Sequence, residues 1–248
     1  MTKTTIIAKD KEHLKELIKE AIQAFGLECD LNYIDVSQVT DMSTLFLESK
    51  FNGDISAWNT SNVQDMRHMF YSSQFNRNVA AWNVENVVDM TLMFKNSKFN
   101  DDLSNWDVGH VVNMESMFEN SIFNQDISSW DTSRVTDMNS MFEKSIFQGN
   151  IAAWNVSKVT DMRSMFQNSI FNENIAAWNV SQALDMFGMF WGSHFNGDIS
   201  AWSFNNDADI DDFFDAGKLD QFEIPNMYHW GFLLKGFVTR NVQWQDHV

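Results

Sequence analysis

Tryptophan and methionine, two residue types that can bind ligands, recur in this sequence at a constant spacing of 24 residues. Exposed indoles stack on sugars, bases and protein partners, and thioethers bind soft metals. We expect both sets to form a core instead, because an exposed tryptophan stripe promotes aggregation and methionine fills gaps between rings. The tryptophan column is Trp58, Trp82, Trp106, Trp130, Trp154, Trp178 and Trp202, and the methionine columns run from Met42 to Met186 and from Met69 to Met189.

Asparagine and aspartate form two further columns, which run from Asn52 to Asn196 and from Asp54 to Asp198. Stacked carboxylates could coordinate calcium, but several members of the second column are uncharged, so we expect hydrogen bonds to turn backbone. The stretch "NDADIDDFFDAG" superficially resembles a calcium loop. It carries Asp212 where an EF-hand requires glycine and Lys218 where it requires glutamate. We therefore predict no bound metal.

Catalytic motifs are missing from the sequence. Six histidines are scattered, without an H-E-x-x-H pattern, a G-x-S-x-G pattern or a glycine-rich phosphate loop. Cys29 is the only cysteine, which excludes an intrachain disulfide and a multi-cysteine metal site. We predict that the protein is not an enzyme and has no cofactor.

The element that must position these columns is an internal repeat. Phenylalanine opens a unit every 24 residues from Phe51 to Phe195, and degenerate units fit at both ends. We predict one structural domain with an N-terminal cap, 1–26, made of a short strand and an amphipathic helix from Asp10 to Gly26. The repeats follow at 27–50, 51–74, 75–98, 99–122, 123–146, 147–170, 171–194 and 195–218, and a C-terminal cap at 219–248.

Each repeat combines two periodicities. In "SNVQDMRHMF", 61–70, the apolar residues follow one face of a helix that Ser61 could cap, with Asp65 in its first turn. The preceding "FNGDIS" predicts a short buried parallel strand around Ile55. One strand and one helix per unit predict an α/β repeat solenoid, a leucine-rich-repeat-like right-handed coil.

The units resemble the BspA-like leucine-rich repeat of bacterial surface proteins. The resemblance rests on "FNENIAAWNVSQALDMFGMF" at 171–190 and "FNQDISSWDTSRVTDMNSMF" at 123–142, and it covers about residues 27–218. It implies a scaffold that binds proteins or host and matrix components, with no catalytic residues to carry over.

Net charge and segment composition indicate the kind of partner and the cellular location to expect. The 34 acidic and 17 basic residues give a formal charge of −17, which repels nucleic acid and anionic membranes and favours a partner with a basic surface. The sequence shows no signal peptide or anchor, so we expect a cytoplasmic monomer without membrane insertion. The family resemblance gives the bacterial cell surface as the alternative.

A binding surface is expected where the repeats differ from one another. Side chains at corresponding positions of the predicted helix vary freely, and Phe187 with Trp191 forms an apolar pair where other copies are polar. Contact with the C-terminal segment is the alternative role of that pair. We predict a protein–protein interaction scaffold, with a carbohydrate- or calcium-dependent adhesion module as the alternative. The candidate residues are Arg67, His68, Tyr71, Glu115, Glu119, Glu143, Arg163, Phe187 and Trp191.

Overall fold

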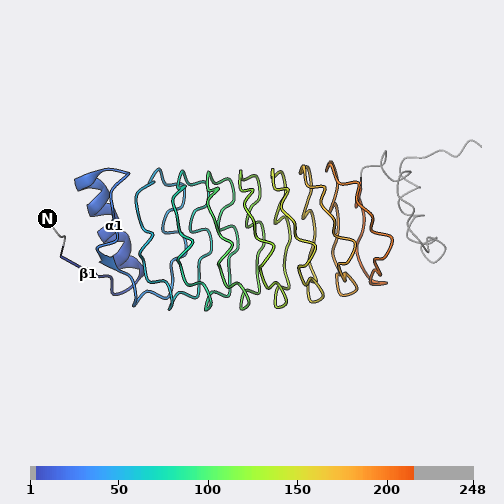
Figure 1. The fold of residues 1–248 in the computed structure, drawn as a ribbon, viewed down its shortest axis with the longest axis horizontal. Coiled ribbons are helices and arrows are strands. Elements are labelled where there is room, and N and C mark those ends of the chain that lie inside the picture. Colours follow the sequence, from blue (N-terminus) through green and yellow to red (C-terminus); the bar gives the residue numbers. More distant parts are fainter. Residues whose placement is uncertain (1–3, 215–248) are drawn as a thin grey trace, which may run out of the picture.

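The computed structural model describes residues 4–214 as an elongated stack of similar coils, with a helix at its N-terminal end (Figure 1). Each coil corresponds to one 24-residue repeat, and we number the coils 1 to 8 from residue 27. Coil 8 is described only as far as residue 214. The remainder of the eighth predicted repeat and the predicted C-terminal cap, 219–248, lie outside the described residues.

The N-terminal end of the stack is covered by helix α1, Lys11–Phe25. Asp10 caps it by accepting the N–H of His13, and Gly26 ends it at a φ of 86°, so both predicted helix boundaries are confirmed. Leu14, Ile18 and Ala21 are buried against coil 1. Phe25, expected on the same face, is 61% exposed.

Two short strands attach this cap to coil 1. Strand β1, Ile6–Ile7, pairs in parallel with β2, Ile34–Asp35, and these two strands are the only sheet in residues 4–214. The other parallel pairings are single bridges between neighbouring coils. Seven of these join the position of Asp41 to that of Asp209 in steps of 24 residues.

The helix predicted in every repeat is wrong. Residues 61–70 form a series of turns, and the same holds for the equivalent residues of the other described coils. The N–H groups of Met66, His68 and Phe70 donate to carbonyls of the next coil. The N–H groups of Met69 and Tyr71 close turns by donating to the carbonyls of Met66 and His68, each three residues back. Bonding along the stack therefore replaces the i→i−4 pattern of a helix.

We call this part of each coil the ladder segment. It comprises residues 41–48, 65–72, 89–96, 113–120, 137–144, 161–168 and 185–192, with 209–214 in coil 8. Two residues of each complete segment have a positive φ, for example His68 at 57° and Ser72 at 52°. Such left-handed residues are incompatible with a continuing helix. The turns still direct the methionines and phenylalanines to one side, which explains why the apolar spacing resembled a helix.

The parallel strand predicted at "FNGDIS" is also absent from the described coils, apart from one bridge between Asp30 and Asp54. The inter-coil backbone bonds concentrate on the ladder segment instead. Ile55 and its equivalents are nevertheless buried, as predicted. The inter-coil backbone bonding predicted for the strand half is therefore found in the half that was predicted to be helical.

The interior consists of stacked aromatic columns and methionines, which confirms the predicted core. Trp58 and the five indoles up to Trp178 are each 3% exposed, and both methionine columns are fully buried. Neighbouring rings lie nearly parallel, as for Trp58 and Trp82 at 6.2 Å and Phe46 and Phe70 at 5.5 Å. Because each ring is covered by its copy in the next coil, no coil completes its core alone.

Polar groups inside the stack are satisfied by the same repetition. The indole Nε1 of Trp82 donates to the Ile55 carbonyl of the preceding coil at 3.1 Å, and every later tryptophan of the column does the same. The Oδ1 atom of Asn52 accepts the N–H of Asn76 at 2.8 Å, and Asp54 accepts the N–H of Ser56 at 2.9 Å. The predicted role of the Asn and Asp columns in turn hydrogen bonding is thus confirmed.

Candidate functional site

The nine predicted surface residues all lie in ladder segments, which the inter-coil hydrogen bonds hold in register. Their side chains occupy three equivalent positions, two, three and six residues after the bridge position of Asp65. We call the outward side chains of these segments the ladder face. Its backbone is nearly identical in every coil, whereas its side chains differ. The structure therefore places on one face residues that are far apart in sequence, such as Arg67 in coil 2 and Phe187 in coil 7.

Two arginines form equivalent clamps on this face, four coils apart. Arg67 contacts the carboxylate of Asp65 at 2.6 Å and that of Asp89 in the next coil at 3.9 Å. Arg163 contacts Asp161 at 2.9 Å and Asp185 at 3.4 Å. Hydrogen bonding to Asp65 raises the pKa of the Arg67 guanidinium, and Asp161 does the same for Arg163. The clamps offset repulsion along the column of stacked aspartates.

These aspartates were predicted to lie in the first turn of a helix, and that prediction is wrong. Asp65 accepts the backbone N–H of Arg67 at 3.0 Å, two residues along the chain. The equivalent bond recurs from Asp41 to Asp209. An aspartate or asparagine oxygen is needed for this turn, which explains why Asn113 replaces aspartate in coil 4 without changing the fold.

The middle of the ladder face carries acidic groups without such a clamp. Burial raises the pKa of Glu115, and the neighbouring charge of Asp137 raises it further. Burial also raises the pKa of Asp137, although the N–H of Asn139 partly opposes this effect. Nearby, Glu119 pairs with Lys95 at 2.6 Å and Glu143 with Lys144 at 2.5 Å. Glu115 and Asp137 therefore have the least compensated charges of this region.

The remaining candidates lie towards the two ends of the face. His68 and Tyr71 lie side by side with ring centroids 6.0 Å apart, and burial lowers the pKa of His68. Phe187 and Trp191 are 37% and 43% exposed. Glycine occupies positions 188 and 192 in that coil, with φ values of 62° and 65°, where most other coils carry larger side chains. Contact of this pair with the C-terminal segment concerns residues outside the described part.

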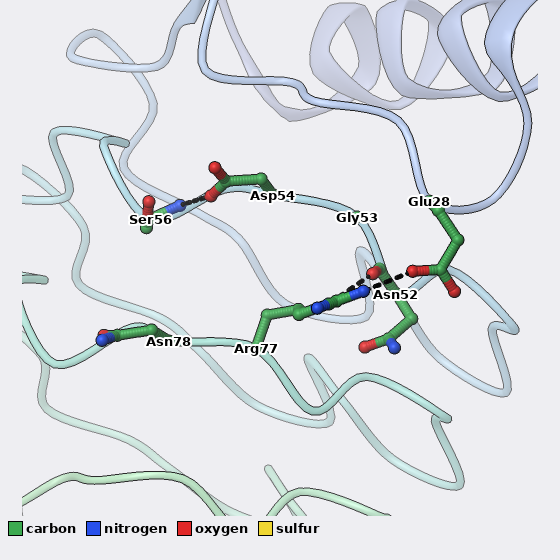
Figure 2. A pocket seen from close by; sticks show the side chains of 7 residues that line it. All are labelled: Glu28, Asn52, Gly53, Asp54, Ser56, Arg77 and Asn78. Carbon is green, nitrogen blue, oxygen red and sulfur yellow. Dashed lines mark hydrogen bonds and ion pairs between the residues drawn. The ribbon is translucent and has the colours of Figure 1, made fainter.

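A polar hollow lies away from the ladder segments, between coils 1, 2 and 3 (Figure 2). The side chain of Arg77 crosses it, donating to the Asn52 carbonyl at 3.0 Å and pairing with Glu28 at 2.6 Å. The N–H of Ser56 lowers the pKa of Asp54 beside it, and the Arg77 charge adds to this effect. The hollow is lined by Glu28, Asn52, Gly53, Asp54, Ser56, Arg77 and Asn78. Its charged groups are already paired within the hollow. We call these contacts a clasp, because Arg77 of coil 3 links coils 1 and 2 through Glu28 and Asn52.

A second clasp escaped the sequence analysis. Lys11 of α1 pairs with Asp41 of coil 1 at 3.1 Å and also donates to the Ser43 hydroxyl. Burial raises the pKa of Asp41, but the hydrogen bonds from Ser43 and Lys11 outweigh this and lower it overall. Only the position of Lys11 at the start of a helix next to an atypical first repeat could have suggested the contact.

Within residues 4–214, no three His, Cys, Asp or Glu side chains are arranged to hold a metal ion. The oxygens of the Asn and Asp columns accept backbone N–H groups instead, as described above. The same residues contain no helix with the length and apolar character needed to cross a bilayer.

The architecture defines a repeat protein whose constant core supports a variable polar face. Comparison with protein families agrees with the repetition, because one family model matches twice in tandem, at residues 13–122 and 119–227. The chain belongs to this family, described as Mycoplasma protein of unknown function, DUF285. No curated protein and no solved structure matches the chain.

Proposed function

We propose that the protein is a non-catalytic scaffold that binds another protein through its ladder face. The observation that carries the proposal is the contrast between a repeated backbone and core and nine side chains of differing types, none of them buried, held in register on it. Repeat proteins recognise partners by varying surface residues without altering the stack that supports them. We also propose that the units are BspA-like repeats, and such a relationship agrees with a role in binding.

The chemistry of the face selects a partner with a basic surface. Arg67 and Arg163 illustrate how a guanidinium fits over the aspartate column, with contacts to two successive coils. Between them, Glu115 and Asp137 form no ion pair of this kind. Burial and neighbouring carboxylates raise their pKa values, and the charges of Lys95 and Arg163 only partly oppose this. A cationic side chain of a partner would relieve that repulsion, and the overall charge of −17 would speed its approach.

A peptide titration tests this proposal. Fluorescence anisotropy is measured for labelled oligoarginine and oligoglutamate peptides mixed with the full chain, at low and at high ionic strength. We expect oligoarginine alone to bind and its affinity to fall with added salt, because screening weakens charge attraction. The double variant Glu115→Gln/Asp137→Asn should lower the affinity at low salt.

The control variant removes the same charge elsewhere. Asp102→Asn/Asp126→Asn changes two aspartates outside the ladder segments, in the column that holds Asp54. The proposal requires a larger loss of affinity from the ladder-face variant than from this control. Equal losses from both would mean that net charge alone attracts the peptide, and the ladder face would then have no special role.

A carbohydrate-binding adhesion module is the second candidate, favoured by the exposed rings of Phe187 and Trp191. Exposed aromatic rings stack on the apolar faces of sugars. Binding to a glycan array by the full chain, and its loss in Trp191→Ser, would support this candidate. An array without signal removes it. The same array with and without added calcium tests whether such binding depends on the metal.

A further inference from the structure

The sequence contains the octapeptide "FNGDISAW" twice, at 51–58 in coil 2 and at 195–202 in coil 8. Each copy contains an Asn-Gly pair, the dipeptide most prone to spontaneous loss of the asparagine amide. Glycine makes the reaction easy because no Cβ hinders approach of its backbone nitrogen to the preceding side chain. Identical local sequence gives both copies the same intrinsic reactivity, so any difference between them arises from their surroundings.

In coil 2, hydrogen bonds on every side hold the Asn-Gly pair. The Asn52 N–H donates to the Leu27 carbonyl at 2.9 Å, and its Oδ1 accepts the N–H of Asn76 at 2.8 Å. The carbonyl of Asn52 accepts Nε of Arg77 at 3.0 Å, as Figure 2 shows. Rotation of the Asn52 side chain towards the nitrogen of Gly53 would break the bond to Asn76.

The glycine of this copy is also enclosed. Gly53 is buried, and a Cβ placed on it would come within 2.0 Å of the Cys29 carbonyl oxygen in coil 1. The next residue, Asp54, donates its N–H to that same oxygen at 3.2 Å. The backbone of coil 1 therefore leaves little room for the five-membered ring that the reaction must form.

Among the residues that the structure describes, most of these restraints are missing from coil 8. Asn196 is exposed and Gly197 is half-buried. The N–H of Asn196 donates to Oδ1 of Asn172 at 2.8 Å, but the side chain of Asn196 accepts no N–H group from any described residue. The three atoms nearest to a Cβ on Gly197 all belong to the ring of Phe195, on its own coil. The Asn196 side chain can therefore rotate without breaking a hydrogen bond to any coil in the described part of the chain.

We propose that Asn196 is a site of spontaneous deamidation in the folded protein and that Asn52 is protected by its neighbouring coils. The Gly197 nitrogen attacks Cγ of Asn196, forming a C–N bond and losing its proton. The Cγ–Nδ2 bond breaks, and the departing nitrogen takes up a proton and leaves as ammonia. Water then opens the resulting succinimide at either carbonyl, giving an aspartyl or an isoaspartyl linkage.

The isoaspartyl product would alter coil 8 specifically. It inserts one methylene into the main chain, between the N–H of Asn196 that bonds to coil 7 and the indole of Trp202 that donates to the Ile175 carbonyl. The two contacts would then no longer fit the 24-residue register at once. Modification would therefore loosen the last described coil and leave coils 1 to 7 intact, whatever partner the ladder face binds.

Peptide mass spectrometry of the full chain tests the proposal. The folded protein and the urea-unfolded protein are incubated at mildly alkaline pH, and conversion at the two sites is followed in time. In the folded chain we expect conversion at Asn52 to be at least about tenfold slower than at Asn196, since it requires breaking structural hydrogen bonds. In urea the two rates should be equal because the octapeptides are identical.

Two variants sharpen the measurement. Asn196→Gln should abolish conversion at that site, because a glutamine side chain forms the corresponding ring far more slowly. Arg77→Ala, which removes an exposed side chain over Asn52, should raise the rate at Asn52 and leave Asn196 unchanged. Equal rates at the two sites of the folded chain would overturn the proposal, as would protection of Asn196 by folding to the same degree as Asn52.

Discussion

Coil 2 and coil 8 begin with the same eight residues but have different neighbours. Their local hydrogen bonds agree closely: Asp54 accepts the Ser56 N–H at 2.9 Å, and Asp198 accepts the Ser200 N–H at 2.8 Å. Burial differs at the Asn-Gly pair, because Gly53 is buried and Gly197 is half-buried. Local sequence therefore fixes the turns of the coil, and the adjacent coils fix how tightly it is enclosed.

The difference extends to the ladder segments that follow. Coil 2 places Met66 and Met69 in the core, both fully buried. Coil 8 places Ile210 and Phe213 at these positions, and Ile210 is only partly buried. Phe213, at a methionine position, meets Phe190 edge to face at 83°, whereas Phe190 and Phe214 continue the parallel stack of the inner coils at 5.4 Å. The aromatic columns thus continue into coil 8, where Ile210 and Phe213 replace the two methionines.

The largest expected effect comes from removing an indole in each copy. Trp58→Ala should lower the free energy of unfolding by about 3–5 kcal/mol, because it leaves a cavity between packed coils. Trp202→Ala removes an equally large side chain, but in a repeat protein the terminal coil can fray alone. Denaturant unfolding followed by circular dichroism should therefore show a smaller change in the main transition.

Amide hydrogen exchange shows which coils lose stability in each of the two variants. Trp202→Ala should increase exchange in coil 8 only, whereas Trp58→Ala should affect coils on both sides of coil 2. If both variants shifted the main transition equally, the coils would unfold as one unit and the contrast between inner and terminal coils would be lost.

A smaller effect should follow from relieving backbone strain. His68 of coil 2 has a φ of 57°, a conformation that costs a residue with a Cβ about 1–2 kcal/mol. His68→Gly removes this cost, but glycine loses more backbone entropy on folding, which costs about 0.5–1 kcal/mol. We therefore expect the free energy of unfolding to rise by about 0.5–1 kcal/mol. Asp212, at 52° in coil 8, belongs to a residue type that tolerates this region, so Asp212→Gly should gain less.

His68→Ala is the control for this prediction, because it removes the imidazole and keeps the strained backbone. Thermal unfolding of the three variants gives the comparison. A His68→Gly protein no more stable than His68→Ala would show that the left-handed conformation carries no cost in this turn.

The smallest effect concerns the two aspartates of the octapeptides. Hydrogen bonds from Ser56 and Ser200 lower the pKa values of Asp54 and Asp198 below 3.8. Since the folded-state pKa lies below the unfolded value, each carboxylate stabilises the fold above the unfolded pKa, and this contribution is lost as the pH falls through the folded pKa. Titration followed by NMR should show both shifts directly.

Arg77→Ala separates the two sites in the same titration. The Arg77 charge contributes to the lowered pKa of Asp54, whereas only the Ser200 hydrogen bonds lower that of Asp198. The variant should therefore raise the pKa of Asp54 towards 3.8 and leave Asp198 unchanged. An unchanged Asp54 would mean that its pKa depends on the turn alone in both copies.

The sequence was sufficient to predict the repeat, its boundaries within the described part, the buried columns and the helix from Asp10 to Gly26. These features depend on composition and spacing, because a residue type that returns every 24 positions must occupy the same place in every coil. The candidate residues of the ladder face were found in the same way, as positions where the repetition fails. Their role in binding stays a prediction.

The path of the backbone through each coil was decided only in the tertiary structure. Val63, Met66, Met69 and Phe70 have helical spacing, yet successive turns bury the same residues and release alternate N–H groups for bonding to the next coil. A lone repeat would have no partner for those N–H groups. Local helix propensity therefore does not include the stabilisation that comes from bonding to the next coil. Likewise, two identical octapeptides differ in enclosure because a sequence specifies its own turns, whereas neighbouring coils decide what remains exposed.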